Sequence, residues 1–283
     1  MIENQIWLDR IIQNALEEDL GGGDLTTDAI IDPEIRGKAV LETRQPMVLA
    51  GLHVFSRVFQ LLSSEIQFEY FFKDGHQVPK GEKICILSGS LSAILKAERT
   101  ALNFIQRMSG IATLTRSYVD KVATLKVKVL DTRKTAAGLR VLDKYAVRMG
   151  GGFNHRLGLY DGILIKDNHI MAAGSIAKAI TLARESVPHT LKVEVEVEDL
   201  SGVEEAIQAG ADTVLLDNMS TDEMREAVRL SGGKVTIEAS GNVNLENIIE
   251  IAQTGVDLIS VGALTHSASA VDMSLELIPS TLD

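Results

Sequence analysis

The stretch LKVEVEVED, residues 191–199, alternates valine with glutamate, which is the period of a β-strand. Its valines share one face of the strand, and the other face carries Glu194, Glu196 and Glu198. Valines suit the layer between a sheet and its covering helices, so the glutamates should turn toward the interior of a barrel. Because ionised carboxylates are almost never buried without a cation, at least one should meet a metal ion, a lysine or an arginine. The alternative is an edge strand with a solvated acidic face.

Similar units flank this strand from residue 126 onward. Each is a short β-branched run that ends in a polar residue or a glycine, followed by a segment with apolar residues at helical spacing. The landmarks at the strand ends are Asp131, Lys166, Glu196, Asp217, Ser240 and Gly262, and the steps between them are 35, 30, 21, 23 and 22 residues. These steps match a repeated strand, turn and helix, which predicts an α/β fold with a parallel sheet.

Six units are fewer than the eight of a complete α/β barrel, and an open doubly wound sheet is the alternative. We favour an open, incomplete α/β barrel. Every strand ends in a polar residue or a glycine of the kind used in binding sites, and in a barrel all strand ends meet on one face. The first hundred residues mix helical and strand patterns without a repeat, and a helical stretch from Ser92 is expected to break at Ser109–Gly110. We therefore expect domains at residues 1–110 and 111–270, with the C-terminal tail, about 270–283, packing on the first.

The composition restricts the class of function. The chain has 283 residues, a formal net charge of −11 and a hydrophobic fraction of 45%. That charge argues against general affinity for nucleic acid, although a local group of cations could still bind a small anion. The single cysteine, Cys85, excludes an internal disulfide, and no apolar stretch approaches the roughly 20 residues that a membrane span needs. The first residues are acidic, unlike a signal peptide, so we expect a cytoplasmic protein.

Cations gather on the same face, over two consecutive units. LDTRK supplies Arg133 and Lys134, NHR supplies His155 and Arg156 after three glycines, and ILIK ends in Lys166. Arginine binds carboxylates through two parallel hydrogen bonds, and lysine often serves as a point charge for phosphate. Any one of these residues alone would indicate a surface ion pair. Together they indicate an anion site, in which the glycines leave room for a ligand beside His155 and Arg156.

Two further signals lie at the later strand ends. Glu196 and Asp217 should lie on adjacent strands, and such a pair suits Mg²⁺, which usually bridges to substrate phosphates. Acidic residues that cap the following helices are the alternative. The segments EASGN and SVGALTHS supply glycines, and the first runs directly into an expected helix, an arrangement that favours phosphate. The pattern predicts transfer to or from a phosphorylated sugar that carries a metal-bound polyphosphate, with a carboxylated second partner.

These motifs together resemble the quinolinate phosphoribosyltransferase family, also called nicotinate-nucleotide pyrophosphorylase (carboxylating). The resemblance is carried by DTRKT, by DKYAVRMGGGFNHRLGLYDGILIKDNH at residues 143–169, and by VEVE, LLDN, EASGN and VGALTHS. It extends to EEDLGGGDLTTDAI (17–30) and KAERTALNFIQRMSGIAT (96–113). It implies an N-terminal α/β sandwich domain and an open α/β barrel, in a homodimer or hexamer whose active site is shared between subunits.

The resemblance also implies a reaction. Phosphoribosyl would pass from phosphoribosyl pyrophosphate to quinolinate with decarboxylation, giving nicotinate mononucleotide, pyrophosphate and CO₂ in NAD biosynthesis. By this resemblance Arg133, His155, Arg156 and Lys166 would bind quinolinate, and Arg99 would reach the site of the neighbouring subunit. Lys134, Glu196 and Asp217 would act as catalytic residues, with Asn218 beside them, and Glu196 and Asp217 would hold Mg²⁺. The 5-phosphate would be surrounded by Ser240, Gly241, Asn242, Gly262 and Ala263.

Three positions depart from the pattern of the family. Residues 135–138 read TAAG where Thr-Thr-Pro-Gly is common, and losing the proline should make this loop more flexible. Met149 stands where cysteine is common, which is an exchange compatible with a core. Asn242 replaces a frequent glycine in the phosphate loop, and asparagine tolerates the left-handed backbone better than most residues.

Three other functions stay open. A related pyrophosphorylase with the same fold, including the molybdenum-associated homologues, could act on another base or acid. A barrel aldolase could use Lys166 as the amine of a Schiff base. A non-catalytic anion-binding protein is the third, although Glu196 and Asp217 argue against it because binding alone does not require a metal pair.

Overall fold

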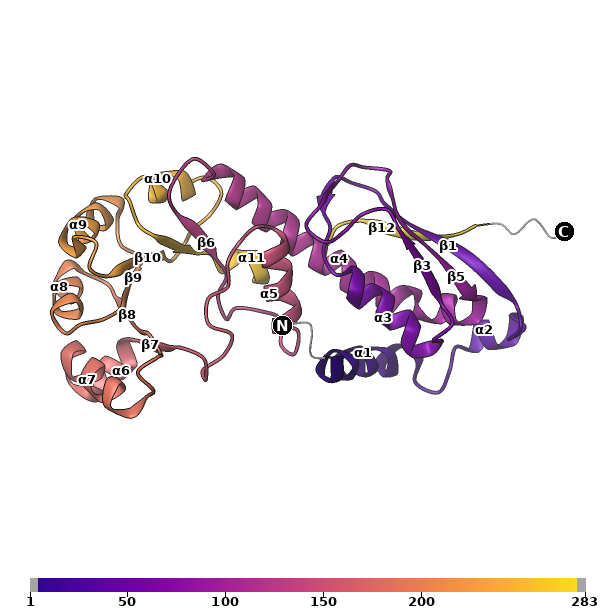
Figure 1. Cartoon of the computed structure of the whole chain (residues 1–283), viewed down its shortest axis with the longest axis horizontal. Helices are drawn as coiled ribbons and strands as arrows, with labels where there is room; N and C mark the ends of the chain where they lie inside the picture. Colours follow the sequence, from indigo (N-terminus) through magenta and orange to yellow (C-terminus); the bar gives the residue numbers. More distant parts are fainter. Residues whose placement is uncertain (1–4, 279–283) are drawn as a thin grey trace. The chain divides into compact units, whose positions relative to one another are not determined.

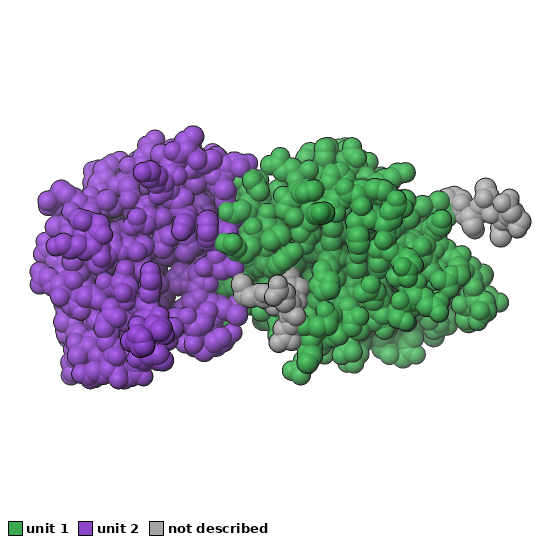
Figure 2. All heavy atoms as spheres, viewed as in Figure 1, with its two compact units in different colours: residues 1–116, 136–151, 268–283 green, residues 117–135, 152–267 purple. Residues whose placement is uncertain are grey.

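The computed structural model describes residues 5–278, and the chain divides into two compact units (Figure 2). The first unit contains residues 1–116, 136–151 and 268–283, and the second contains residues 117–135 and 152–267. Residues 136–151 thus group with the first unit, whereas the sequence analysis placed residues 111–270 together. The end of the expected C-terminal tail, residues 279–283, lies outside the described residues.

The second unit is built on a six-stranded sheet in which every neighbouring pair is parallel (Figure 1). Its strands lie in the order β6-β11-β10-β9-β8-β7. Their bounds are β6 Lys128–Leu130, β7 Ile163–Ile165, β8 Val193–Val197, β9 Thr213–Asp217, β10 Thr236–Ser240 and β11 Leu258–Ser260. Because β6 and β7 end this order without pairing with each other, the sheet is an open α/β barrel. The fold class expected from the repeat is confirmed.

Helices follow the strands, and α7, α8 and α9 lie on the outer side of this sheet (Figure 1). Their bounds are α6 Asp167–Ala173, α7 Ile176–Ser186, α8 Leu200–Gln208, α9 Thr221–Ser231, α10 Ile248–Ala252 and α11 Ala263–His266. Val193 and Val195 of β8 and Val214 of β9 are fully buried. Burying each valine contributes about 1.5 kcal/mol or more of hydrophobic free energy. The same strand alternation turns Glu194 and Glu196 to the opposite face of the sheet.

The first unit contains a four-stranded antiparallel sheet in the order β12-β1-β5-β3. Its bounds are β1 Arg36–Thr43, β3 Gln67–Tyr70, β5 Lys83–Ser90 and β12 Met273–Ile278, and β2 Met47–Val48 pairs separately with β4 Gln77–Val78. The helices of this unit are α1 Gln5–Leu20, α2 Leu25–Ile30, α3 Leu52–Leu62, the greater part of α4 Leu91–Lys121, and α5 Arg140–Met149. Edge-on ring contacts join Phe55 and Phe59 of α3 to Phe68 of β3. Helix α3 therefore packs on the sheet through aromatic side chains.

Two glycines are explained by close approach within the first unit. The expected break at Ser109–Gly110 is wrong, because α4 is continuous through both residues. A Cβ at Gly110 would lie 2.1 Å from the carbonyl oxygen of Ser269, so glycine is needed there for packing. A Cβ at Gly150 would lie 2.5 Å from the carbonyl oxygen of Ala112, also on α4. The first glycine of GGGFNHR thus lets α5 end against α4, and it is not there to leave room for a ligand.

Among the described residues, no helix combines the length and the apolar character needed to cross a bilayer.

Candidate functional site

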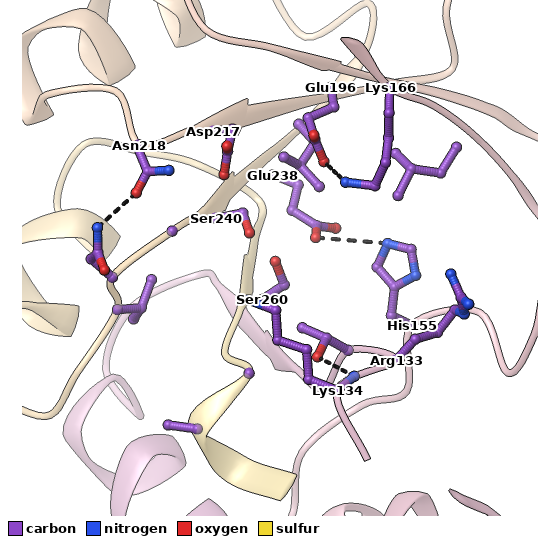
Figure 3. A pocket seen from close by; sticks show the side chains of 18 of the residues that line it. Arg133, Lys134, His155, Lys166, Glu196, Asp217, Asn218, Glu238, Ser240 and Ser260 are labelled. Carbon is purple, nitrogen blue, oxygen red and sulfur yellow. Dashed lines mark hydrogen bonds and ion pairs between the residues drawn. The ribbon is translucent and has the colours of Figure 1, made fainter. Parts of the chain in front are cut away.

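A pocket of about 660 Å³ opens at the carboxyl ends of the strands of the second unit (Figure 3). This volume is within the usual range for small-molecule sites. All of the sequence-predicted site residues except Arg99 line it: Arg133, Lys134, His155, Arg156, Lys166, Glu196, Asp217, Asn218, Ser240, Gly241, Asn242, Gly262 and Ala263. The tertiary structure therefore brings together residues that are more than a hundred positions apart in the sequence.

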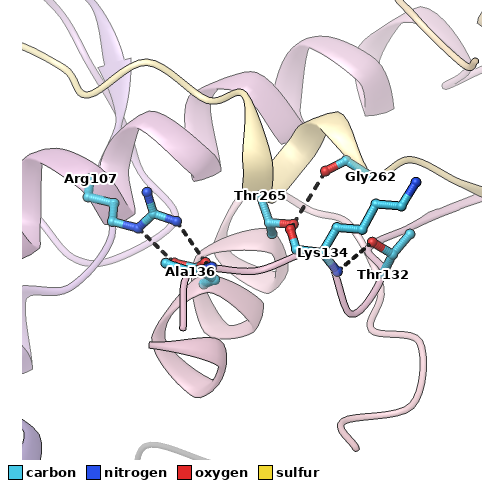
Figure 4. A network of polar contacts seen from close by, with 7 residues as sticks. Arg107, Thr132, Lys134, Ala136, Gly262 and Thr265 are labelled. Carbon is cyan, nitrogen blue, oxygen red and sulfur yellow. Dashed lines mark hydrogen bonds and ion pairs between the residues drawn. The ribbon is translucent and has the colours of Figure 1, made fainter. Parts of the chain in front are cut away.

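The segment after β6 carries Arg133 and Lys134 and is held by its backbone (Figure 4). The amide of Lys134 donates to Oγ1 of Thr132 at 3.0 Å, and Oγ1 of Thr265 donates to the carbonyl of Lys134 at 2.8 Å. A Cβ at Gly262 would lie 3.0 Å from Cδ of Lys134, so glycine leaves space for the lysine stem. These contacts place the Lys134 chain beside the turn that precedes α11.

Residues 135–138, which depart from the pattern of the family, follow this segment. The amide of Ala136 donates to Oδ2 of Asp143 at 3.0 Å, and Asp143 is also bound by two nitrogens of Arg107 (Figure 4). Asp143 is fully buried, and this ion pair with Arg107 compensates its charge. The loop is thus tied through Ala136 to a buried carboxylate within the first unit.

His155 is positioned by a buried carboxylate at the end of β6. Asp131 is fully buried and accepts the backbone amide of His155 at 2.9 Å and the side-chain amide of Asn154 at 2.6 Å. The imidazole Nδ1 accepts the amide of Arg156 at 2.7 Å. The ring proton therefore lies on Nε2, which is 3.0 Å from Oε2 of Glu194. His155 therefore presents a donor at Nε2 to the carboxylates of the site.

Arg156 lies beside Arg133 in a desolvated part of the pocket. Its Nη1 donates to the carbonyl of Gly162 at 2.9 Å, while its buried Nε has no hydrogen-bond partner. Burial lowers the pKa of Arg156 from its usual value, and the nearby charge of Arg133 lowers it further. An anion placed between the two guanidinium groups would relieve this repulsion and satisfy the free N–H.

Lys166 and Glu196 form an ion pair across neighbouring strands β7 and β8 (Figure 3). The backbone amide of Lys166 donates to Nδ1 of His169 at 3.0 Å, so His169 supports the position of Lys166. The expectation that a glutamate of the LKVEVEVED strand meets a lysine at the strand end is confirmed. Glu198, the third glutamate of that face in the sequence, lies beyond β8 and is exposed.

Asp217 ends β9 and is followed by Asn218, which meets Asn242 of the loop after β10. Among residues 5–278, Asn218 and Asn242 are the non-glycine residues with positive φ, at 56° and 50°. Nδ2 of Asn242 donates to Oδ1 of Asn218 at 2.9 Å. Gly241 has φ +94°, and a Cβ there would lie 2.2 Å from Oδ1 of Asn218. The loop after β10 is therefore closely packed on the loop after β9, and Asn242 adopts the left-handed conformation in place of glycine.

The helix expected directly after EASGN begins later than the sequence suggested. Helix α10 starts at Ile248, so its N-terminus does not follow Asn242, and turns of the chain fill the interval. Helix α11, by contrast, begins at Ala263 immediately after Gly262. The difference arises because Asn244 accepts the amides of Glu246 and Asn247, which stabilises a local turn before the helix.

Glu238 lies on the floor of the same pocket, and the sequence analysis assigned it no role. It is 1% exposed, and Glu194, which faces it, is 9% exposed. His155 Nε2 is 3.8 Å from Oε1 of Glu238, and these three residues are the described group with metal-ligand spacing. The available signal was alternation in KVTIEAS, which puts Glu238 on the same face as Ser240.

The pocket is also lined by six further residues that were not predicted: Thr132, Leu164, Leu215, Val243, Ser260 and His266. Arg99 lies on α4 in the first unit, where it is exposed, and it does not line this pocket.

Comparison with known proteins identifies the family. The model of the N-terminal domain of quinolinate phosphoribosyl transferase matches residues 24–109, and that of the C-terminal domain matches residues 111–276. A Bacillus subtilis relative named probable nicotinate-nucleotide pyrophosphorylase [carboxylating] is 43% identical, over 97% of this chain and 94% of the relative. A Nicotiana tabacum quinolinate phosphoribosyltransferase [decarboxylating] is 41% identical, over 94% of this chain and 81% of the relative.

A solved structure supports the same assignment. The nicotinate-nucleotide pyrophosphorylase from Francisella tularensis is 45% identical, matches 96% of both chains and superposes with a TM-score of 0.92. Family models, relatives and structure agree over nearly the whole length of the chain. The chain belongs to the quinolinate phosphoribosyltransferase family of enzymes.

Proposed function

We propose that this enzyme transfers phosphoribosyl from phosphoribosyl pyrophosphate to quinolinate, with decarboxylation, in a Mg²⁺-dependent reaction of de novo NAD biosynthesis. The products are nicotinate mononucleotide, pyrophosphate and CO₂. The observation that carries the proposal is a single pocket in which Arg133, Arg156 and Lys166 lie with carboxylates at the ends of β8 and β9. Such a pocket offers cations to one anionic substrate and oxygen ligands to the metal of the other.

The cationic side of the pocket would bind quinolinate. This ring carries two carboxylates, and arginine fixes a carboxylate in orientation as well as in place. The unpartnered Nε of Arg156 supports this role. The Nε2 proton of His155, which faces Glu194 in this structure, would be donated either to Glu194 or to an oxygen of the substrate. Lys166 would exchange its pairing with Glu196 for a substrate carboxylate, which also frees Glu196.

Glu196 and Asp217 would hold Mg²⁺. The residues fit this ion, because both offer carboxylate oxygens to the pocket and neighbouring Asn218 adds an amide oxygen. Mg²⁺ typically takes one or two carboxylates, keeps several waters and completes its shell with substrate phosphates. When bound, it would neutralise the charge of the departing pyrophosphate.

The phosphate end of the sugar would lie by the loops after β10 and β11. Ser240, Gly241 and Asn242 form the first loop, and Gly262 with Ala263 opens α11. Glycines let the backbone approach a phosphate closely. Lys134, whose stem passes beside Gly262, would supply a positive charge to the same substrate.

The chain's own residues would direct the reaction by position and charge. The cations orient the ring so that its nitrogen faces the anomeric carbon of the sugar. The carboxylates of Glu196 and Asp217 would stabilise the positive charge that develops on the sugar as pyrophosphate leaves. The positive charge of the quaternised ring nitrogen would then stabilise the electron pair left on C2 when the 2-carboxylate departs as CO₂.

We further propose a cytoplasmic homodimer or hexamer in which Arg99 serves the site of a neighbouring subunit. The resemblance noted from KAERTALN supports this, together with the exposure of Arg99. The single cysteine, buried Cys85, is in keeping with a reducing compartment.

The test is release of CO₂ from quinolinate labelled in its 2-carboxylate, measured with and without phosphoribosyl pyrophosphate and with Mg²⁺ or a chelator. We expect release only when phosphoribosyl pyrophosphate and Mg²⁺ are both present. Absence of release, or equal turnover of nicotinate, would contradict the substrate. A covalent adduct at Lys166 after borohydride reduction with a carbonyl substrate would instead support the aldolase alternative.

A further inference from the structure

Two buried carboxyl groups face each other beneath the pocket. Glu194 projects from β8 and Glu238 from β10, and ligand atoms of these two residues and His155 all lie within 4.8 Å of one another. Oε1 of Glu194 and Oε1 of Glu238 are both buried and have no hydrogen-bond partner. His155 Nε2 lies nearer Glu194, at 3.0 Å, than Glu238, at 3.8 Å, and Figure 3 shows the His155–Glu238 pair.

This arrangement favours a proton on one of the carboxyl groups. Two carboxylates so close together in a desolvated site repel each other strongly, even beside the donors His155 and Ser260. Burial, then the charge of Glu194 and that of Asp131 just after β6, together raise the pKa of Glu238 to about 7. His155 and the hydroxyl of Ser260 on β11 act in the opposite direction. A dianionic substrate in the pocket adds repulsion and favours the protonated form still more.

A metal ion is a poorer explanation of the same cluster. Nδ1 of His155 accepts the amide of Arg156, so Nε2 carries the ring proton and donates instead of ligating. Metal binding at Nε2 would require the loss of that proton or of the backbone contact. The cluster is therefore suited to holding a proton.

The proposed reaction needs a proton at this place. When CO₂ leaves, the electron pair of the broken C–C bond remains on C2 of the ring, and a proton must replace the carboxylate there. Glu196 is paired with Lys166, and Asp217 lies at the outer end of β9. Glu238 lines the pocket floor beside His155, which is proposed to touch the same ring.

We propose that Glu238 is a catalytic residue that enters the reaction as a neutral carboxylic acid and donates its proton to C2 of the ring. In this step the O–H bond of Glu238 breaks, a C2–H bond forms, and the electron pair left by CO₂ becomes that bond. Glu238 is left as a carboxylate and regains a proton from water after the product leaves. The inference rests on the proposed function and adds to it the residue that completes decarboxylation.

The first experiment compares Glu238→Gln with the unchanged enzyme. The amide keeps the size of the side chain and its neutrality but has no acidic proton, so quinolinate should bind within about threefold of normal affinity. Formation of nicotinate mononucleotide should fall about 100-fold or more, as general acids typically contribute 10²–10⁴-fold. In a 1:1 mixture of H₂O and D₂O, the H/D ratio at C2 of the product should change, because water would replace the carboxyl group as donor.

The control is Glu250→Gln on the exposed face of α10, which should leave the rate and the H/D ratio unchanged. An E238Q rate within twofold of normal, with the same H/D ratio, would overturn the proposal. If E238Q does not fold, Glu238→Asp provides the test. It retains an acid that is one methylene farther from the ring, so the rate should fall while the H/D ratio stays normal.

Calorimetry gives a readout that does not depend on turnover. Quinolinate binding to the unchanged enzyme, measured between pH 6 and 9 in buffers of different ionisation enthalpy, should be accompanied by proton uptake. E238Q should lose that uptake. Quinolinate binding without proton uptake anywhere in this range would overturn the role of Glu238, whereas no binding and no turnover by the unchanged enzyme would contradict the proposed function itself.

Discussion

At the scale of single residues, the site is organised by pairs of opposite charge and by one pair of like charge. Lys166 pairs with Glu196, and buried Asp131 fixes the backbone at His155. Glu194 and Glu238 are the exception, because they bring two acids together. Such exceptions to ordinary burial are typical of functional sites, where shifted pKa values are useful.

The raised pKa of Glu238 predicts a specific dependence of stability on pH. The unfolded chain ionises this group near pH 4.5 and the folded chain near pH 7, so the folded state binds more protons between these values. The free energy of unfolding contributed by this group is therefore highest below pH 4.5 and falls as pH rises to about 7. E238Q should gain stability relative to the unchanged protein over this window, measured by urea unfolding at pH 5, 6, 7 and 8. A difference that is independent of pH would contradict the assignment.

Arg156→Lys should separate the two substrates. Lysine keeps the positive charge but loses the fork of donors and the contact with the carbonyl of Gly162. We expect KM for quinolinate to rise about tenfold or more, equivalent to one charged hydrogen bond, while KM for phosphoribosyl pyrophosphate stays within twofold. Steady-state kinetics in both substrates measures this, and equal changes in the two KM values would contradict the assignment of Arg156.

At the scale of elements, the ends of the strands determine where the site lies, and the loops after them determine the shape of the pocket. Neighbouring strands β9 and β10 pair Asp217 with Ser240, so the loops that follow begin side by side. This register explains why Asn218 and Asn242 meet. The loops after β9 and β10 are consequently joined by one side-chain hydrogen bond.

Gly241→Ala tests this packing. The new Cβ would adopt φ +94° and collide with Asn218, so stability should fall by about 1–3 kcal/mol and KM for phosphoribosyl pyrophosphate should rise. Gly174→Ala is the matched control, because Gly174 has φ +99° at the end of α6 with no atom within 4 Å of the new Cβ. It should lose stability but keep KM. Unfolding curves and steady-state kinetics of both variants are the measurements. Equal KM values for phosphoribosyl pyrophosphate in the two variants would contradict a role of the Gly241–Asn218 packing in binding.

At the scale of the whole molecule, the negative surface and the cationic pocket have different roles. The whole chain carries a net charge of −11. Its pocket, by contrast, is lined by four cationic side chains, those of Arg133, Lys134, Arg156 and Lys166. The pocket attracts small anions through local charge, whereas the overall charge disfavours polyanions.

The proposed sharing of sites between subunits predicts complementation. Arg99→Ala and Arg133→Ala homo-oligomers should each be nearly inactive. In mixed oligomers, some sites would combine an intact Arg99 with an intact Arg133, so part of the activity should return. Activity of co-refolded mixtures, with mixing verified by mass-tagged subunits, is the measurement. No recovery in verified mixed oligomers would contradict a shared site.

Much of this protein could be predicted from local patterns. The alternation in LKVEVEVED identifies a strand with a valine face and a glutamate face, and the spacing of the landmarks identifies the α/β repeat. Arg133, Lys134 and Lys166 follow strands whose ends must meet, whereas His155 and Arg156 lie in the segment between α5 and β7 and still reach the pocket. Gly150 was misinterpreted, because its role depends on α4, which is distant in the sequence.

The sequence by itself determined which residues alternate along a strand, where the strand–helix unit repeats and which charged residues lie near the strand ends. These are properties of residues that are close together in the chain. Only the tertiary structure decided that Glu238 faces Glu194, that His155 donates toward Glu194, and that Lys166 selects Glu196. The physical reason is curvature. Glu194 and Glu238 stand on strands separated by β9, and their carboxyl groups approach only because the parallel sheet curls around its interior.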